Sequence, residues 1–254
     1  MSTEEAEIIR RFMDNVYGKR PNLTGFNINH DGSEGHWLEQ QMGITANCHN
    51  EPDLLGFEMK NDTSGKTTFG DWSADYYLFR DRSFGISRDQ FILMFGKPNP
   101  MKENRYSWSG TPIPTVRRRS EYNGSYMDID PQGNIFIYYE YSSDPRHNKN
   151  NIIPQCLRDS RITLAKWERN NLEGKLSRKF GGNGWFKCYK DENGIYSSIA
   201  FGEPMIFDNW LNLIREGVVF FDSGMYQGNP RNYSQWRANN RYWEKLIVRR
   251  YPKL

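Results

Sequence analysis

The chain has 254 residues, which is enough for one large domain or two small ones with a sizeable core. Hydrophobic residues make up 37% of it and aromatic residues 15%, so the core must depend on Phe, Tyr and Trp. The net charge is +3, no apolar run approaches the roughly 20 residues of a membrane-spanning helix, and the first residues are acidic where a signal peptide is basic. These features exclude a membrane protein and predict a cytoplasmic one.

Basic residues are concentrated in three segments. Residues 97–119 carry six basic residues and one acidic residue, residues 158–190 carry nine and three, and residues 229–254 carry seven and one. This segregation predicts a surface that binds a polyanion. It favours nucleic acid over an anionic membrane, because no basic amphipathic helix stands out. The alternative is that the three segments are ordinary solvated surfaces.

Cysteine and histidine show no metal-site pattern. Cys48, Cys156 and Cys188 are scattered without C-x-x-C spacing, which predicts reduced thiols rather than a disulfide framework or a zinc site. The four histidines lack H-x₃-H spacing, so none is assigned to a metal.

Two helices and three strands are predicted between residues 1 and 141. Capping-box spacing at Ser2 and Glu5 precedes an apolar helical stripe that ends at Gly18. A short second helix is predicted over residues 35–43. Strands are predicted over residues 54–60, 90–95 and 134–141, and the apolar run of the second places it at the centre of a sheet.

The second half mixes helices and strands. An apolar stripe predicts a helix over residues 163–180, although Gly174 weakens it. Asn193-Gly194 predicts a hairpin between strands at 185–190 and 195–201. A helix over 204–216 and a buried strand over 218–221 follow. These elements predict an α/β or α+β fold without internal repeats or long linkers.

The segment from Asp53 to Lys60 carries the residues that best suit catalysis. Alternate side chains of a strand share a face, so Glu58 and Lys60 should project together, while Phe57 and Met59 project into the core. Asp53, in the preceding turn, can approach Glu58, and two carboxylates can bind a divalent cation such as Mg²⁺. With Lys60 beside the metal, this grouping suits phosphodiester hydrolysis.

Taken alone, this pattern also fits an exposed strand with a salt-bridged face. Glu39 favours the active-site interpretation. It lies 14 residues before Asp53 on the predicted short helix, next to Leu38. Its side chain can reach the same site. Three acids and one lysine then fall within 22 residues.

Two stretches resemble a known family. Gly35-His36-Trp37-Leu38-Glu39-Gln40-Gln41-Met42-Gly43 and the run from Pro52-Asp53 to Lys60 are similar to the core motif of the mismatch-repair nicking enzyme MutH and the monomeric restriction endonucleases MvaI and BcnI. The resemblance implies a PD-(D/E)xK-type fold, with a mixed central sheet flanked by helices and a second lobe that grips DNA. It implies a Mg²⁺-dependent endonuclease, and the restriction members favour a monomer. The implied roles are metal ligation by Asp53, Glu58 and the Met59 carbonyl, catalysis by Lys60, and an accessory acid at Glu39.

A second similar region lies near the C-terminus. Residues 210–222 resemble the helix and strand that precede the DNA-contacting segment in the restriction members, and residues 229–241 fall where that family reads bases. Arg231, Arg237 and Arg241 lie there among Asn and Gln, which is the mixture that major-groove reading needs. The alternative is an exposed terminal helix over residues 234–251 with a solvated basic face.

Four other basic residues are expected to contact DNA. Arg117, Arg118 and Arg119 are consecutive and point in different directions, so they suit a phosphate clamp better than base reading. Some restriction members have a histidine where Gly96 falls, and whether Lys97 substitutes for it is left open.

The combined interpretation is a single endonuclease unit over residues 1–254. Its catalytic lobe is expected over about residues 1–100 plus parts of 130–180, and its DNA-recognition lobe over about 181–254. The predicted function is sequence-specific, Mg²⁺-dependent type II restriction of double-stranded DNA. A strand-nicking repair endonuclease and a non-catalytic DNA-binding protein remain alternatives, whereas a glycosidase with paired carboxylates has no need for the basic segments.

Overall fold

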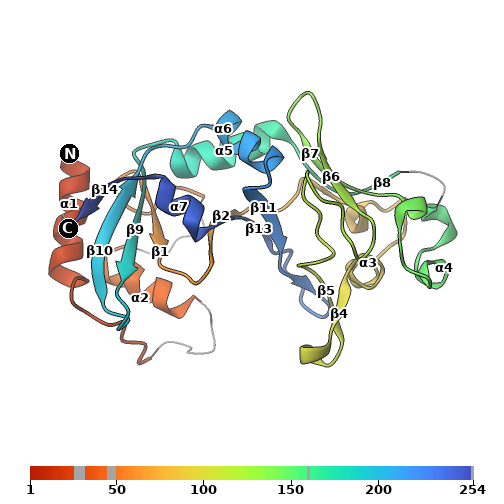
Figure 1. Cartoon of the computed structure of the whole chain (residues 1–254), viewed down its shortest axis with the longest axis horizontal. Helices are drawn as coiled ribbons and strands as arrows, with labels where there is room; N and C mark the ends of the chain where they lie inside the picture. Colours follow the sequence, from red (N-terminus) through yellow and green to blue (C-terminus); the bar gives the residue numbers. More distant parts are fainter. Residues whose placement is uncertain (26–31, 45–49, 159–160, 253–254) are drawn as a thin grey trace. The chain divides into compact units, whose positions relative to one another are not determined.

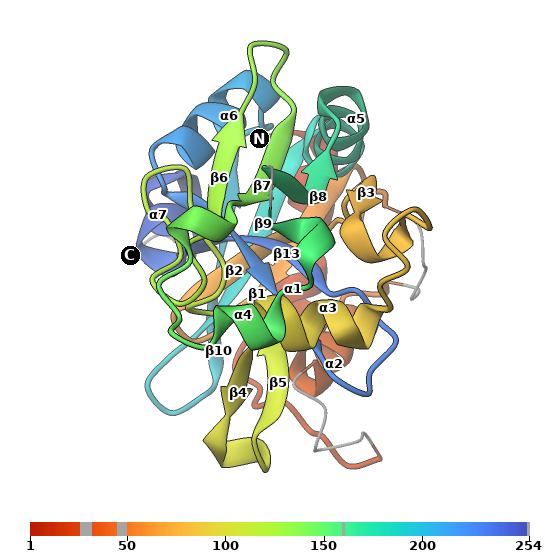
Figure 2. The ribbon, with the colours of Figure 1, turned by 90° about the vertical axis from the view of Figure 1, so that its right-hand side faces the viewer.

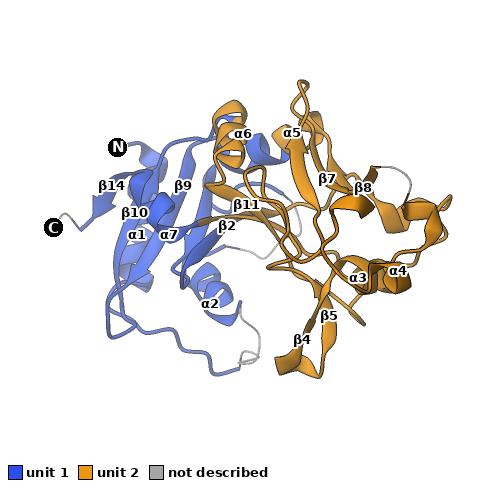
Figure 3. Cartoon of the chain, turned by 45° about the vertical axis from the view of Figure 1, so that its right-hand side comes forward, with its two compact units in different colours: residues 1–67, 175–206, 239–254 blue, residues 68–174, 207–238 orange. Residues whose placement is uncertain are grey.

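The computed structural model describes residues 1–25, 32–44, 50–158 and 161–252. The chain divides into two compact units (Figure 3). Unit 1 comprises residues 1–67, 175–206 and 239–254, and unit 2 comprises residues 68–174 and 207–238. Three elements contain a boundary between the units: strand β2 (Lys66–Asp71), helix α5 (Arg169–Phe180) and strand β13 (Ser234–Asn239).

These units differ in their bounds from the lobes predicted from the sequence. Residues 68–100, expected in the catalytic lobe, belong to unit 2, and residues 181–206 and 239–254, expected in the recognition lobe, belong to unit 1. The physical reason is that unit 1 is completed by strands from distant parts of the chain. No local pattern in the sequence predicts that pairing.

Unit 1 is built on a four-stranded mixed sheet in the order β1-β9-β10-β14 (Figure 1). Strand β1 runs parallel to β9, β9 pairs antiparallel with β10, and β10 pairs antiparallel with β14. The predicted mixed sheet and the hairpin at Asn193-Gly194 are confirmed. The bounds of the four strands are β1 Phe57–Asn61, β9 Gly184–Lys190, β10 Tyr196–Gly202 and β14 Ile247–Tyr251.

Helices α1 (Thr3–Asn15) and α2 (Ser33–Gln41) supply the apolar side chains that cover one face of this sheet. The Ser2 hydroxyl accepts a hydrogen bond of 3.2 Å from the backbone N–H of Glu5, which confirms the predicted helix start. The core of unit 1 includes Ile8, Phe12, Val16, Trp37, Leu38, Phe57, Met59, Phe186, Cys188, Ile199 and Phe201.

Tryptophan packing covers part of the opposite face. Trp185 of β9 meets Trp243 of helix α7 (Asn240–Lys245) edge to face, with ring centroids 5.0 Å apart. Because Phe57 and Met59 are buried in the core cluster, Glu58 and Lys60 lie on this second face, as the strand alternation predicts.

Unit 2 contains three short sheets and three helices of its own in the described part of the chain. Figure 2 shows the largest sheet, in the order β3-β8-β7-β6, and the other two have the orders β11-β13-β2 and β12-β5-β4. The strands are β3 Tyr76–Tyr77, β4 Lys97–Asn99, β5 Arg105–Trp108, β6 Tyr126–Ile129, β7 Ile135–Tyr139, β8 Ile162–Trp167, β11 Val219–Ser223 and β12 Met225–Tyr226. The helices are α3 Arg88–Phe95, α4 Lys149–Ile152 and α6 Phe207–Arg215.

The core of unit 2 is aromatic, as the composition predicts. Trp167 packs against Phe221 and Trp236 with ring centroids 4.7 and 5.3 Å apart. Trp210 contacts Trp236 and Trp72 at 5.4 and 5.9 Å. These rings are buried, so they stabilise the unit by packing and are not available to stack on bases.

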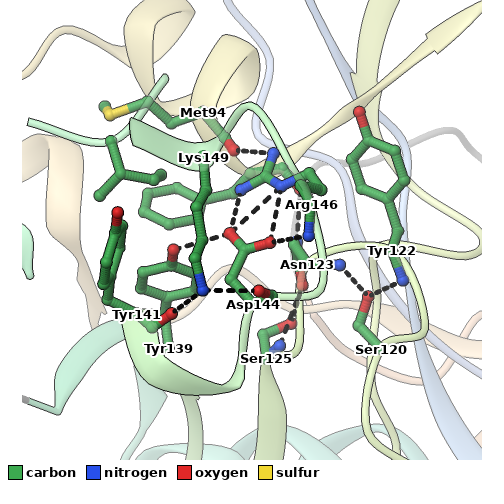
Figure 4. Close-up of polar contacts among 12 residues, drawn as sticks. Met94, Ser120, Tyr122, Asn123, Ser125, Tyr139, Tyr141, Asp144, Arg146 and Lys149 are labelled. Atoms are coloured by element: carbon green, nitrogen blue, oxygen red, sulfur yellow. Dashed lines mark hydrogen bonds and ion pairs between the residues drawn. The ribbon is translucent and has the colours of Figure 1, made fainter. Parts of the chain in front are cut away.

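A buried polar network ties the end of helix α3 to two loops of unit 2 (Figure 4). The carboxylate of Asp144 accepts hydrogen bonds from the Tyr139 hydroxyl at 2.7 Å and from the Arg146 guanidinium at 2.6 Å. Arg146 also donates to the carbonyl of Met94 at 2.8 Å, and Asn123 donates to the carbonyl of Phe95 at 2.7 Å. These donors satisfy carbonyls that a helix end leaves without partners.

The strand predicted over residues 90–95 is wrong. These residues belong to helix α3, which begins with a capping box between Ser87 and Gln90. A short apolar run looks the same in a buried helix and in a buried strand, and here the polar residues before it decide.

The predicted helix over residues 163–180 is confirmed over residues 169–180 and wrong before them, and the alternative of a terminal helix is also wrong. Residues 163–180 form strand β8 and then helix α5, because the apolar stripe joins the alternating pattern of one to the helical pattern of the other. The terminal helix considered over residues 234–251 is instead β13, α7 and β14. Within the described residues, no helix has both the length and the apolar character needed to span a bilayer.

Candidate active site

A tight turn precedes strand β1. Leu54 and Phe57 exchange two backbone hydrogen bonds of 3.0 and 2.9 Å. Between them, Leu55 and Gly56 have φ values of 51° and 81°, so both central residues adopt the left-handed conformation of a type I′ turn. Leucine rarely adopts this conformation, so surrounding contacts must hold the turn in place.

Asn183 provides those contacts. Its side-chain Nδ2 donates to the carbonyl of Leu55 and its backbone N–H donates to the carbonyl of Gly56, both at 3.0 Å. A Cβ at Gly56 would lie 2.9 Å from Nδ2 of Asn183, so this close approach requires glycine. The turn brings Asp53 beside β1, where its Oδ2 accepts a hydrogen bond of 2.8 Å from the N–H of Met59.

Glu58 lies at the centre of the site, and its side chain is only 2% exposed. Its Oε1 is 2.7 Å from Nζ of Lys60 and 3.0 Å from Nζ of Lys179. Its Oε2 is buried and has no hydrogen-bond partner among the described residues. A buried carboxylate oxygen without a donor is costly, so this atom is suited to bind a cation.

The carboxyl groups influence each other's ionisation. Burial, and then the charge of Glu58, raise the pKa of Asp53 to about 7 although Lys60 opposes this shift. Burial also raises the pKa of Glu39 on α2; nearby His36 lowers it, and the charge of Glu58 raises it further. Burial lowers the pKa of Lys60. These couplings place Glu39, Asp53 and Glu58 within electrostatic reach of one another, which is typical of functional sites.

We expect Asp53→Asn to change how the stability of the metal-free protein depends on pH. The ordinary pKa of this carboxyl group is 3.8, whereas the folded protein raises it to about 7. Between these values the unfolded chain loses the proton and the folded chain keeps it, so the free energy of unfolding falls as the pH rises. The wild type should lose roughly 2–4 kcal/mol relative to Asp53→Asn between about pH 4 and pH 8. Denaturation in EDTA tests this, and parallel pH profiles for the two proteins would contradict it.

The donor set fits a hard divalent cation. Mg²⁺ is held in proteins by one or two carboxylates and keeps several water ligands, which matches Asp53 and the vacant Oε2 of Glu58. Among the described residues, no three or more His, Cys, Asp or Glu side chains gather as a metal site. Backbone and water oxygens would therefore complete the coordination. Cys156 and Cys188 are free thiols, and Cys48, His30 and His49 lie outside the described residues.

Sequence reasoning missed Lys179. In the sequence it is one of two basic residues before a glycine-rich loop, and nothing in its spacing indicates which acid it meets. In the structure it reaches Glu58 from the last turn of α5. Phe180, the next residue, lies under the Lys60 ammonium, with 5.2 Å from Nζ to the ring centroid.

The seven predicted DNA-binding residues are divided between the units. Arg241 is exposed on α7 in unit 1, and the others lie in unit 2. Lys97 is exposed on β4. A Cβ at the preceding Gly96 would lie 2.5 Å from the Ile92 carbonyl oxygen and 2.7 Å from that of Ser107, so this position has no room for a histidine.

The predicted phosphate clamp is exposed and partly held by neighbours. Arg117 donates to the carbonyl of Arg215 at 3.0 Å, and Arg119 lies 3.5 Å from the carboxylate of Glu140. Arg118 is exposed between them. All three positions are compatible with phosphate contact, and their role stays a prediction.

The predicted base readers of unit 2 have acidic partners. Arg237 on β13 is 2.9 Å from Asp222 and donates to the Thr68 hydroxyl at 2.9 Å. Arg231 is 64% exposed and lies 3.0 Å from Asp71. Such pairs fix the direction of a guanidinium, so these residues can be positioned in advance for a ligand. Whether they read bases stays a prediction.

Comparisons with known proteins identify the family to which the chain belongs. The sequence model of the LlaMI restriction endonuclease matches residues 17–251. The type II restriction enzyme ScrFI of Lactococcus lactis subsp. cremoris is 45% identical over 268 residues, which cover 98% of each chain. The restriction endonuclease MvaI, in a complex with its cognate DNA substrate, shares the fold with a TM-score of 0.66 at 13% identity, over 98% of each chain. The chain therefore belongs to the LlaMI restriction endonuclease family and is a type II restriction endonuclease.

Proposed function

We propose that this chain hydrolyses phosphodiester bonds at a specific sequence of double-stranded DNA with Mg²⁺ as its cofactor, as a monomer in the cytoplasm. Type II restriction enzymes generally need a divalent metal ion. The observation that carries the proposal is the carboxylate of Glu58, whose Oε1 is held by two lysines while the buried Oε2 has no donor. Mg²⁺ is favoured because two carboxylates with water suit its coordination.

Each residue of the site has a proposed role. Asp53 and Glu58 would hold the ion, with the Met59 carbonyl as a further ligand. The bound ion would polarise the scissile phosphate and acidify a water molecule. Lys60, fixed by Glu58 at 2.7 Å, is suited to orient the attacking water and to stabilise negative charge as it develops. Glu39 is the accessory acid, because its raised pKa suits proton exchange closer to neutral pH.

The purified protein is expected to cut plasmid DNA into discrete fragments with Mg²⁺ and to leave it intact in EDTA. The reason is that hard oxygen ligands leave phosphate activation to the ion. Sequencing the fragment ends would show one recurring sequence at every cut. Cutting in EDTA would contradict the mechanism, and nicked circles alone would support a strand-nicking enzyme instead.

Base-reading and phosphate-clamping arginines are expected to respond differently to substitution. Arg237→Ala or Arg241→Ala should weaken binding to the cleavage site by roughly 1–3 kcal/mol and binding to random DNA much less, because a bidentate bond forms only with the right base. Arg118→Ala should weaken both equally and flatten the salt dependence. Competition binding at two salt concentrations measures both effects. Equal losses of affinity for the cleavage site and for random DNA would show that Arg237 and Arg241 contact phosphates rather than bases.

A further inference from the structure

The C-terminal half of helix α5 and the loop after it contact the proposed metal-binding segment and the residues just before it. The side chain of Asn50 donates to the carbonyl of Lys175 at 2.7 Å. Lys179 contacts Glu58 at 3.0 Å, and Asn183 holds the turn before β1 through Leu55. Of these contacts, the one from Lys179 brings a positive charge to a proposed metal ligand.

This charge makes the site unusual, because two ammonium groups share one carboxylate oxygen. Lys60 and Lys179 both contact Oε1 of Glu58, and their side chains are only 10% and 20% exposed. A divalent cation bound by the same carboxylate would be repelled by both. In a site that is mostly shielded from water, such repulsion is weakly screened.

We infer that Lys179 is a positioning residue that keeps the metal affinity of the DNA-free enzyme low and thereby couples metal binding to DNA binding. The inference rests on the proposed function of Asp53 and Glu58 as metal ligands. DNA phosphates bring negative charge to the site, so they offset the repulsion and offer the ammonium of Lys179 another partner. Metal and DNA then strengthen each other's binding by the same factor, as thermodynamic linkage requires.

The effect of removing Lys179 has a definite sign. Oε1 of Glu58 keeps its contact with Lys60 at 2.7 Å, so the carboxylate stays oriented when Lys179 is replaced. What is lost is the repulsion of one buried charge from the ion. Metal affinity should therefore rise. If Lys179 only supported the structure, its loss would loosen the site and metal affinity would fall.

The test measures binding of Mn²⁺ alone to the DNA-free protein, by electron paramagnetic resonance of the free ion. Lys179→Met keeps the apolar stem and should bind Mn²⁺ about tenfold more tightly than the wild type, or tighter still. Lys179→Arg keeps the charge and should match the wild type. Arg178→Met is the matched control, because it removes the same charge from an exposed neighbouring position and should change little. Lys179→Gln serves as a second neutral variant if Lys179→Met does not fold.

A second readout measures the coupling itself. Binding of a duplex that contains the mapped cleavage site is compared with and without Ca²⁺, and the enhancement by Ca²⁺ should be several-fold smaller in Lys179→Met than in the wild type. Unchanged or weaker Mn²⁺ binding by the neutral variants would overturn the inference. If Glu58→Gln binds Mn²⁺ as tightly as the wild type does, the proposed metal site itself is wrong. This result differs from the one that would overturn only the inference about Lys179.

Discussion

Asp53→Asn is expected to abolish cleavage, with a loss on the order of 10³-fold or more, while the protein remains folded. The substitution removes a charged ligand, whereas the amide oxygen can still accept the hydrogen bond that the Met59 N–H donates at 2.8 Å. It also removes a buried charge, and burial, followed by repulsion from Glu58, is what raises the pKa of this carboxyl group. The measurement is the rate of plasmid cleavage at saturating Mg²⁺, with circular dichroism as the check on folding.

Glu192→Gln is the matched control for this loss. It removes a carboxylate from the exposed turn between β9 and β10 in the same unit, and it should cut at the wild-type rate. Asp53→Asn with a rate close to that of the wild type would remove Asp53 from the site. The same reasoning applies to Glu58→Gln, although this variant should be less stable because two lysines lose their anionic partner.

Lys60→Met is expected to slow the chemical step by roughly 10²-fold or more while DNA binding persists. The methionine keeps an apolar stem near Phe180 but removes the ammonium that lies 2.7 Å from Glu58. Single-turnover cleavage at saturating enzyme separates the chemical step from binding. Lys245→Met, exposed on α7, is the control. If affinity collapsed and the single-turnover rate stayed the same, Lys60 would be a phosphate contact.

The part of the site that the sequence predicts is the part that is local in the chain. The two-residue period of a strand is enough to put Glu58 and Lys60 on one face, and the preceding turn is enough to return Asp53 to that strand. Lys179 and Asn183 could not be found in this way. They reach the site because β9 pairs with β1, and strand pairing between distant segments leaves no spacing pattern in the sequence.

The predicted elements failed where two patterns overlap. Residues 91–95 are apolar throughout, so their own periodicity does not distinguish a helix from a strand. The deciding signal is the capping pair Ser87 and Gln90 just before them. At residues 163–180, apolar residues that alternate in β8 continue at helical spacing in α5, and only the break near Glu168 separates them. In both cases the neighbours of an apolar run carried more information than the run itself.

The parallel pairing of β1 with β9 has a consequence for folding of the chain during its synthesis on the ribosome. Glu39, Asp53, Glu58 and Lys60 are synthesised early, but the strand that pairs with β1 begins only at Gly184, and the edge strand β14 spans Ile247–Tyr251. A nascent chain thus carries every proposed catalytic residue before the sheet that positions these residues can form. Pairing between strands that are distant in the sequence forms late. We therefore expect unfinished or prematurely terminated chains not to cleave DNA. In a cell that makes this nuclease, only completed molecules would then cut DNA.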